Sequence, residues 1–255
     1  MTNIELGRVF ADAEVAALYR YRAPYPREVF EILEQLAVEP RNVLDAGAGT
    51  GALARELAPL VARVDAVDPS AAMIAAGRAL PGGDDPRITW IQGSAEDAPL
   101  SPPYGLIVAG ASLHWMDPRI VLPRFRDALA PGARLAIVHN EFVPPHALAT
   151  EAALDVIRRY SPLKDDPPEY PARVKALVDR GLFVLEGERW TTPVPFEQSI
   201  DGVLNSLHST STLSRVTLGD RLASFDSDMR AALASYGKGP LRSDIVAYIA
   251  WGRPS

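Results

Sequence analysis

One stretch, VLDAGAGTGALA at residues 43–54, constrains the fold of this chain more than any other. Its apolar start is typical of a buried strand, and three glycines follow at alternate positions, Gly47, Gly49 and Gly51. The next residues place Leu53 and Leu57 on one face of a helix, which Pro59 must end or kink. A strand, a glycine loop and a helix in this order bring backbone close to a nucleotide-like ligand.

Short apolar runs alternate with helical patterns through the first 140 residues. Ser70 is placed to cap one of the helices. Such alternation predicts βαβ units, and therefore an α/β fold with a doubly wound, mostly parallel, Rossmann-like sheet covered by helices on both faces. We expect strands at 42–47, 63–69, 88–93, 105–111 and 134–140, and helices at 26–40, 52–60, 70–80 and 117–130.

The pattern changes after residue 140. A Pro-rich loop begins at Ser161, and an extended pair is expected around 183–197. We expect helices at 147–160, 172–181, 199–216 and 221–236, and a strand at 243–252 that returns to the sheet. The sequence thus predicts a ligand-binding core with N-terminal helices at 1–140, and helical lid or substrate-binding insertions plus the last strands at 141–255.

Composition excludes several classes of site. The chain of 255 residues has no cysteine, so disulfides and thiolate metal sites are excluded, and its four histidines are scattered, so we expect no metal. The net charge of -6 disfavours a nucleic-acid partner. The N-terminal stretch lacks the apolar region of a signal peptide, and prolines and glycines interrupt the longest uncharged run, 98–116. We expect a cytoplasmic protein without membrane association.

Two ligands compete for the glycine loop. Gly47, Gly49 and Ala52 satisfy the G-x-G-x-x-G/A pattern of dinucleotide sites, in which a pyrophosphate sits on the helix N-terminus. Asp45 would repel a pyrophosphate by about 1–4 kcal/mol at a separation of about 4 Å. S-adenosylmethionine has no phosphate, and its ammonium and sulfonium groups are positive. Asp45 therefore favours S-adenosylmethionine over a dinucleotide.

The motifs also resemble a known family, the class I S-adenosylmethionine-dependent methyltransferases. VLDAGAGTG resembles their first motif, VDAVDPSAAMI the second, IQGSAEDAPL the third, and GLIVAGASLHWMD the fourth strand. The L-H-W-x-D ending and YRYRAPYP at 19–26 are similar to the type-11 and trans-aconitate-methyltransferase-like branch. The resemblance covers residues 19–140 closely. Three positions depart from the pattern: Ser94 replaces an acid, Gly105 replaces Asp, and Ala23 replaces Pro.

This resemblance implies S-adenosylmethionine as the cofactor and S-adenosylhomocysteine as the product. It implies that Asp68 holds the ribose hydroxyls, that the third motif contacts adenine, and that Arg22 pairs with the cofactor carboxylate. The complete set of implied cofactor-binding residues is Arg22, Asp45, Gly47, Ala48, Gly49, Thr50, Gly51, Asp68, Pro69, Ser70, Met73, Ser94, Ala95, Glu96, Gly110, Ala111 and Trp115.

Two histidines are candidates for a catalytic base. His114 is placed by motif at the ligand edge of the sheet, where it could be a base, a substrate contact or a structural residue. His208 lies in a hydroxyl-rich stretch and could serve equally, whereas His139 and His146 are interpreted as structural. We expect a methyltransferase acting on a small organic molecule, with O, N and C acceptors and the oligomeric state open. The alternatives are a non-methylating S-adenosylmethionine-binding enzyme of the same fold and an NAD-type oxidoreductase.

Overall fold

The computed structural model describes residues 7–144, 146–163, 168–236 and 239–255. They fall into two compact units, neither of which is one continuous stretch. The sheet unit contains Pro24–Asn140, Pro168–Thr192 and Ala247–Ser255. The helical unit contains Met1–Ala23, Glu141–Pro167 and Pro193–Val246, as far as these are described. The chain passes from one unit to the other five times, once between Asn140 and Glu141.

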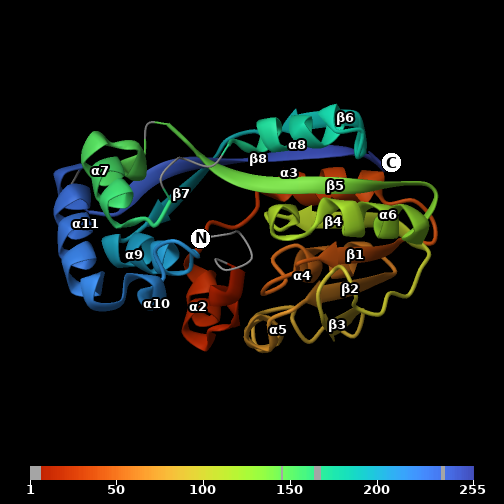
Figure 1. The fold of residues 1–255 in the computed structure, drawn as a ribbon, viewed down its shortest axis with the longest axis horizontal. Coiled ribbons are helices and arrows are strands. Elements are labelled where there is room, and N and C mark those ends of the chain that lie inside the picture. Colours follow the sequence, from red (N-terminus) through yellow and green to blue (C-terminus); the bar gives the residue numbers. More distant parts are fainter. Residues whose placement is uncertain (1–6, 145, 164–167, 237–238) are drawn as a thin grey trace. The chain divides into compact units, whose positions relative to one another are not determined.

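Eight strands form one sheet of order β3-β2-β1-β4-β5-β8-β6, with β7 also paired to β8 (Figure 1). Neighbouring strands from β3 to β5 are parallel, whereas β6 and β7 run antiparallel to β8. This confirms the predicted doubly wound, mostly parallel α/β sheet. The strands are β1 Asn42–Ala46, β2 Arg63–Asp68, β3 Ile88–Gln92, β4 Tyr104–Gly110, β5 Leu129–Val143, β6 Phe183–Trp190, β7 Val194–Gln198 and β8 Leu241–Pro254.

Helices cover both faces of the sheet in the sheet unit. One core layer joins Leu33 of α3 (Arg27–Leu36) and Leu57 of α4 (Ala54–Leu57) to Val43 and Leu106 of the sheet. The opposite layer joins α6 (Pro118–Ala128) and α8 (Tyr170–Asp179) to Leu44. Strands buried on both faces explain why the apolar runs of the sequence are nearly continuous.

Local signals in the sequence explain several element ends. Ser70 accepts a hydrogen bond from Met73 N at 3.1 Å and caps α5 (Ala71–Arg78), as predicted. α4 ends at Leu57, and Pro59 lies in the 3₁₀ turn η3 (Ala58–Leu60) that follows it. Gly181, with φ 66°, follows the C-terminus of α8. Pro123, by contrast, lies inside α6 without ending it.

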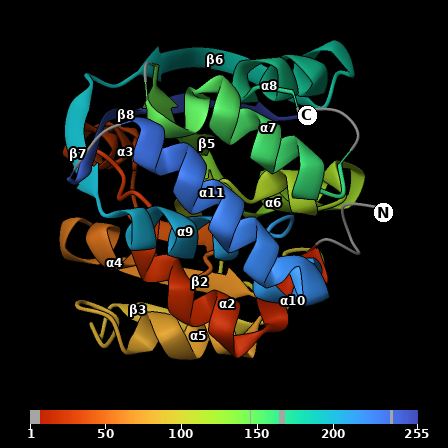
Figure 2. The same cartoon turned by 90° about the vertical axis from the view of Figure 1, so that its left-hand side faces the viewer.

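The helical unit has its own core. Phe225 and Met229 of α11 (Leu222–Tyr236) pack with Leu204 and Leu207 of α9 (Ile200–His208), and Figure 2 shows α7 (Glu151–Tyr160) alongside α11. The remaining short elements are η1 Arg8–Ala11, α2 Ala13–Leu18, η2 Tyr19–Tyr21, η5 Ala147–Ala149, α10 Arg215–Leu218 and η6 Gly219–Arg221.

One predicted helix is wrong as a single element. The stretch 199–216 contains α9 and the first residues of α10, with a break after His208. The hydroxyls of Ser209 and Thr210 donate to the carbonyls of Ser206 and Leu207 at 2.6 and 2.7 Å. Side chains of this kind compete with the helical backbone for its hydrogen bonds.

Two predicted strands are longer than their patterns indicate. β5 begins at Leu129, and the register between β4 and β5 shifts after Tyr104 pairs with Leu129. β8 starts at Leu241 because its first residues pair with β7. Within the described residues, no helix has both the length and the apolar character needed to cross a membrane.

Candidate functional site

Strand order reverses between β1 and β4, which places a ligand site at the carboxyl ends of these strands. The glycine loop follows β1 at this edge, and φ is 71° at Gly47, 56° at Gly49 and 72° at Gly51. These angles lie in the left-handed region, where glycine avoids the cost that a Cβ brings. A Cβ on Gly47 would also stand 2.5 Å from Ser112 Cβ. The fold therefore requires glycine here for conformation and for space.

Backbone hydrogen bonds fasten the loop to the neighbouring strand. The amides of Gly47 and Ala48 both donate to Val67 O at 2.9 Å. The hydroxyl of Ser112, which follows β4, donates to Ala46 O at 2.6 Å. The loop is thus held in shape from β2 on one side and from the segment after β4 on the other.

Asp68 ends β2 and closes on the glycine loop. Its Oδ2 accepts from Gly49 N at 2.7 Å, and its Oδ1 accepts from Ser70 N at 2.8 Å. Burial raises the pKa of this carboxyl and outweighs the two amide donors, which lower it. Each carboxylate oxygen accepts more than one hydrogen bond, so Asp68 retains capacity for a diol beside the loop.

Asp45 lies beneath the loop and is only 2% exposed. Its Oδ2 accepts from Ala54 N, the first residue of α4, at 3.0 Å. Burial raises its pKa from 3.8 to about 7, the Ala54 amide opposes this shift, and the charge of Asp68 adds to it. A cationic ligand at the loop would lower the pKa of both carboxyls, because it stabilises their charged forms.

The third-motif residues are fastened to α6. Glu96 Oε1 accepts from Asp117 N at 2.9 Å, and Arg124 donates to Glu96 O at 3.0 Å. Ser94 Oγ donates to Asp97 Oδ1 at 2.7 Å, so a carboxylate stands beside the hydroxyl that replaces the usual acid. Ala95 is buried.

The segment after β4 forms the other wall of the edge. Ala111 has φ 52°, which is strained for an alanine, and its amide donates to Val138 O at 2.8 Å. A Cβ on Gly110 would stand 2.9 Å from Tyr25 Oη. His114 and Trp115 follow in the 3₁₀ turn η4 (Leu113–Trp115).

His114 belongs to an aromatic cluster that the sequence did not reveal. Its Nδ1 lies 3.0 Å from Tyr170 Oη, and the ring of His139 stacks on Tyr170 at 3.7 Å and 9°. Burial, followed by the charges of Arg173 and His139, lowers the pKa of His114 to about 3. Tyr170 is 56 residues from His114 in the chain and carries no motif, so no sequence signal joins the two.

His208 lies in the helical unit and is 1% exposed. Its Nδ1 lies 2.9 Å from Leu213 O, and its Nε2 lies 2.9 Å from Asp226 Oδ1. Both ring nitrogens therefore have a partner within the same unit.

Arg22 also belongs to the helical unit, where Ser209 and Tyr19 engage its guanidinium. Its Nε donates to Ser209 Oγ and its Nη2 to Ser209 O, both at 2.8 Å, and the group lies 3.9 Å from the Tyr19 ring centroid. The other predicted cofactor residues all lie in the sheet unit. Among them Thr50 and Met73 are buried, whereas Pro69 is exposed.

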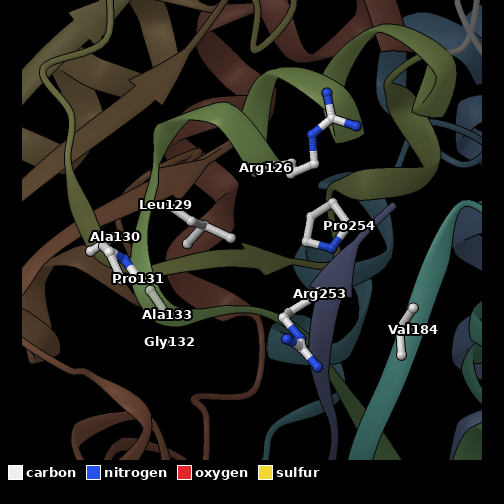
Figure 3. Close-up of a pocket in the computed structure, with 9 residues that line it drawn as sticks. All are labelled: Arg126, Leu129, Ala130, Pro131, Gly132, Ala133, Val184, Arg253 and Pro254. Atoms are coloured by element: carbon white, nitrogen blue, oxygen red, sulfur yellow. The ribbon is translucent and has the colours of Figure 1, made fainter.

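A hollow of about 490 Å³ lies at the opposite edge of the sheet unit, where β5 begins. Figure 3 shows the guanidinium groups of Arg126 and Arg253 directed away from each other. Arg126 pairs with Asp127 at 2.9 Å and Arg253 with Glu186 at 2.6 Å. The hollow therefore lacks converging polar groups and is separate from the glycine loop. The described residues contain no group of three or more His, Asp or Glu side chains placed to hold a metal ion.

Residues 43–132 match the family described as a methyltransferase domain. The chain is 36% identical over 127 residues to an uncharacterised methyltransferase of Mycobacterium tuberculosis, covering 49% of this chain and 50% of that protein. It is 34% identical over 126 residues to trans-aconitate 2-methyltransferase of Streptomyces avermitilis, covering 47% of each. The chain thus matches about half the length of these curated relatives.

Two solved structures extend the likeness over most of the chain. A candidate type II methyltransferase of Anaeromyxobacter dehalogenans has a TM-score of 0.63 at 29% identity, covering 91% of this chain and 97% of the other. A methyltransferase of Geobacter sulfurreducens in complex with S-adenosylhomocysteine has a TM-score of 0.54 at 18% identity, with 97% and 98% covered. The second likeness concerns the fold alone.

Proposed function

We propose that this chain, whose residues 43–132 match a methyltransferase domain, is a class I S-adenosylmethionine-dependent methyltransferase that transfers the cofactor's methyl group to a small organic acceptor. One observation carries the proposal. Three left-handed glycines form a loop at the strand reversal, and the amide of Gly49 is tied to the buried carboxylate of Asp68. The loop offers close backbone approach, and its two buried acids, Asp45 and Asp68, suit a cation-bearing nucleoside.

The chemical groups at this edge of the sheet suit the ribose, the amino-acid end and the adenine of S-adenosylmethionine. Asp68 has acceptor capacity for the ribose hydroxyls, and the backbone of the glycine loop would lie against the amino-acid end. Ser94, Ala95 and Glu96 would hold the adenine, with Asp97 supporting the hydroxyl of Ser94. When bound, S-adenosylmethionine supplies a methyl group on a positively charged sulfur, which leaves as S-adenosylhomocysteine once a nucleophile has taken the methyl.

The protein's own contribution is placement. In-line transfer requires the nucleophile and the methyl carbon to be aligned at roughly 3 Å, and a rigid site supplies much of the rate by holding them so. We assign the alignment of the nucleophile with the methyl carbon to the segment after β4, which contains Ala111, His114 and Trp115.

A carboxylate-bearing acceptor has support from one relative, which is named for trans-aconitate. A carboxylate attacks with a lone pair that it already has, so such a reaction requires no protein base. The sequence and the site are compatible with O, N or C as the methylated atom, and the proposal covers a small molecule of any of these classes.

Calorimetric titration of the purified protein with S-adenosylmethionine, S-adenosylhomocysteine and NAD tests the cofactor. We expect micromolar binding of the first two and none of NAD. Replacing Asp68 by Ala removes a charged acceptor, so affinity should fall roughly ten- to hundredfold, or about 1.5–3 kcal/mol.

Two further variants make this result specific. Asp68→Asn keeps the shape of the side chain and should also weaken binding. Asp84→Ala changes an exposed acid in the turn before β3 and should leave the affinity unchanged. Binding of NAD alone, or equal binding by Asp68→Ala and the wild type, would overturn the assignment.

A further inference from the structure

One end of the glycine loop lies against the ring of Trp90. A Cβ on Gly51 would stand 2.5 Å from Cη2 of this ring, and a Cβ on Gly77, in the last turn of α5, would stand 2.6 Å from the same atom. The outer edge of the indole therefore fills the space between the loop and α5. Since a helical backbone suits alanine better than glycine, it is the space and not the conformation that requires glycine at position 77.

A turn holds the Trp90 ring in this position. Its Nε1 donates to Gly83 O at 3.0 Å, and Gly83 lies in the turn that follows α5. The turn packs directly on the helix, because a Cβ on Gly83 would collide with Gly77 O. The ring cannot swing away from Gly51 without breaking its hydrogen bond, so ring, turn and helix support the loop together.

Arg55 fastens the same turn to the glycine loop from a different element. Its Nε donates to Thr50 O at 3.1 Å, and its Nη1 donates to Pro81 O at 2.8 Å. Arg55 belongs to α4, whereas Trp90 belongs to β3. Two side chains thus join the turn after α5 to the loop after β1, and they meet the loop at neighbouring residues, Thr50 and Gly51.

These contacts act on the peptide group between Thr50 and Gly51. Its carbonyl accepts from Arg55, and its N–H donates to Ala48 O at 2.8 Å. Gly51 has φ 72°, and glycine has more alternative conformations than any other residue. A loop with this freedom has to be ordered when a ligand binds, which lowers the affinity unless the protein has ordered the loop beforehand.

We propose that Trp90 and Arg55 are positioning residues, which act through Thr50 and Gly51 to hold the glycine loop in its binding conformation before the cofactor arrives. This inference rests on the proposed function, because it takes the loop as a surface that binds the cofactor. Trp90 packs on the core layer that contains Leu57, so it supports the loop from the core of the sheet unit. Loss of either side chain weakens cofactor binding by leaving the loop to be ordered during binding.

Hydrogen exchange of the ligand-free protein tests whether the ring holds the loop. Trp90→Phe keeps an aromatic core residue but lacks the indole N–H and the ring edge that meets Gly51. We expect the amide of Gly51 to exchange roughly tenfold faster in this variant, and saturating S-adenosylhomocysteine to restore its protection. Trp251→Phe is the matched control, since Trp251 is half-buried on the same core layer and lies against Gly187 of β6. It should leave the exchange of Gly51 unchanged.

Calorimetric titration with S-adenosylhomocysteine tests the consequence for binding, at a temperature where circular dichroism shows each variant to be folded. We expect roughly tenfold weaker affinity for Trp90→Phe. Arg55→Lys keeps the charge but lacks the fork that joins Thr50 O to Pro81 O, so its affinity should fall by a similar factor. Arg126→Lys changes an exposed arginine at the opposite edge of the sheet unit and should bind as the wild type does.

The possible outcomes separate this inference from the proposed function. Wild-type affinity in Trp90→Phe and Arg55→Lys, or unchanged exchange of Gly51 in Trp90→Phe, would overturn the positioning role even if both variants melt at a lower temperature. Either result would leave the proposed function standing if the wild type binds S-adenosylhomocysteine. Absence of binding by the wild type would overturn the proposed function, and the exchange of the ligand-free loop then decides whether Trp90 holds it.

Discussion

At the scale of single residues, the buried carboxyl of Asp45 makes the stability of the fold depend on pH. A carboxyl whose pKa is raised from 3.8 to about 7 binds its proton more tightly in the folded chain than in the unfolded one. The protonated form therefore contributes stability that is complete below pH 3.8 and is lost as the pH rises through about 7. A cation at the loop restores part of that loss, because it stabilises the charged form.

Replacing Asp45 by Asn should remove this pH dependence. Asn keeps an oxygen for the Ala54 amide but has no charge to desolvate, so we expect the free energy of unfolding at pH 8 to rise by about 2–4 kcal/mol. The gain over the wild type should shrink toward pH 4. Urea unfolding at pH 4, 6 and 8 measures it, and a variant that is no more stable than the wild type at pH 8 would contradict the raised pKa.

The same residues show how far sequence reasoning reaches. The glycines and Asp68 were predictable because a short loop fixes their spacing, and the structure brings them within hydrogen-bond distance. Tyr170 was not predictable, because its partner lies in a different element and the contact depends on how α8 packs on the sheet. His208 was predicted as a candidate base from its hydroxyl-rich surroundings, yet those hydroxyls break a helix and do not bind its ring.

At the scale of elements, the glycine loop is bounded by a tryptophan. A Cβ on Gly51 would stand 2.5 Å from Cη2 of Trp90, a ring whose indole N–H donates to Gly83 O at 3.0 Å. That hydrogen bond limits how far the ring can move aside. The loop after β1 and the strand β3 are thus fitted to each other through one ring.

Gly51→Ala should destabilise the protein by about 2–4 kcal/mol, from the left-handed φ and the collision with Trp90 together. Gly132→Ala is the matched control, since Gly132 has φ 80° and nothing within 4 Å of the added Cβ. It should cost only the conformational part, about 1–2 kcal/mol. If urea unfolding gives the same loss in the free energy of unfolding for both variants, the Trp90 ring moves aside without cost and the predicted collision is wrong.

Elements were predictable where a strong period coincides with a clear end signal. Strands β1 to β4 were predicted to within one residue at each end, because buried parallel strands are continuous apolar runs bounded by glycine, proline or a cap. The helices α2 and α10 could not be predicted from the pattern of apolar residues, because helices of four to six residues contain too few turns for their period to be recognised. The early start of β5 follows from the pairing of Leu129 with Tyr104, which is a tertiary contact.

At the scale of the whole molecule, the chain is divided between two cores, each of which joins segments far apart in the sequence. His208 lies in the second core, against Phe225 at 5.6 Å between ring centroids. Its two hydrogen bonds join α9 to the segment before α10 and to α11.

Replacing His208 by Leu should therefore affect the helical unit selectively. It removes the ring contacts to Leu213 O and to Asp226 Oδ1, so we expect a loss of about 2–3 kcal/mol, seen as faster hydrogen exchange of the amides in 200–236. Affinity for S-adenosylhomocysteine should stay within twofold of the wild type. A tenfold weaker affinity with unchanged exchange would instead place His208 in the binding site.

The strand order has a consequence for synthesis. β8 follows β6 in the chain but lies between β5 and β6 in the sheet. While the ribosome has made only the parallel strands, β5 has an unpaired edge, and β6 has no partner until β8 emerges. Because an unpaired edge is a template for other chains, the nascent protein passes through a period in which aggregation competes with folding. Chaperones that bind exposed strands should therefore engage this protein after β5 has emerged and before β8 does.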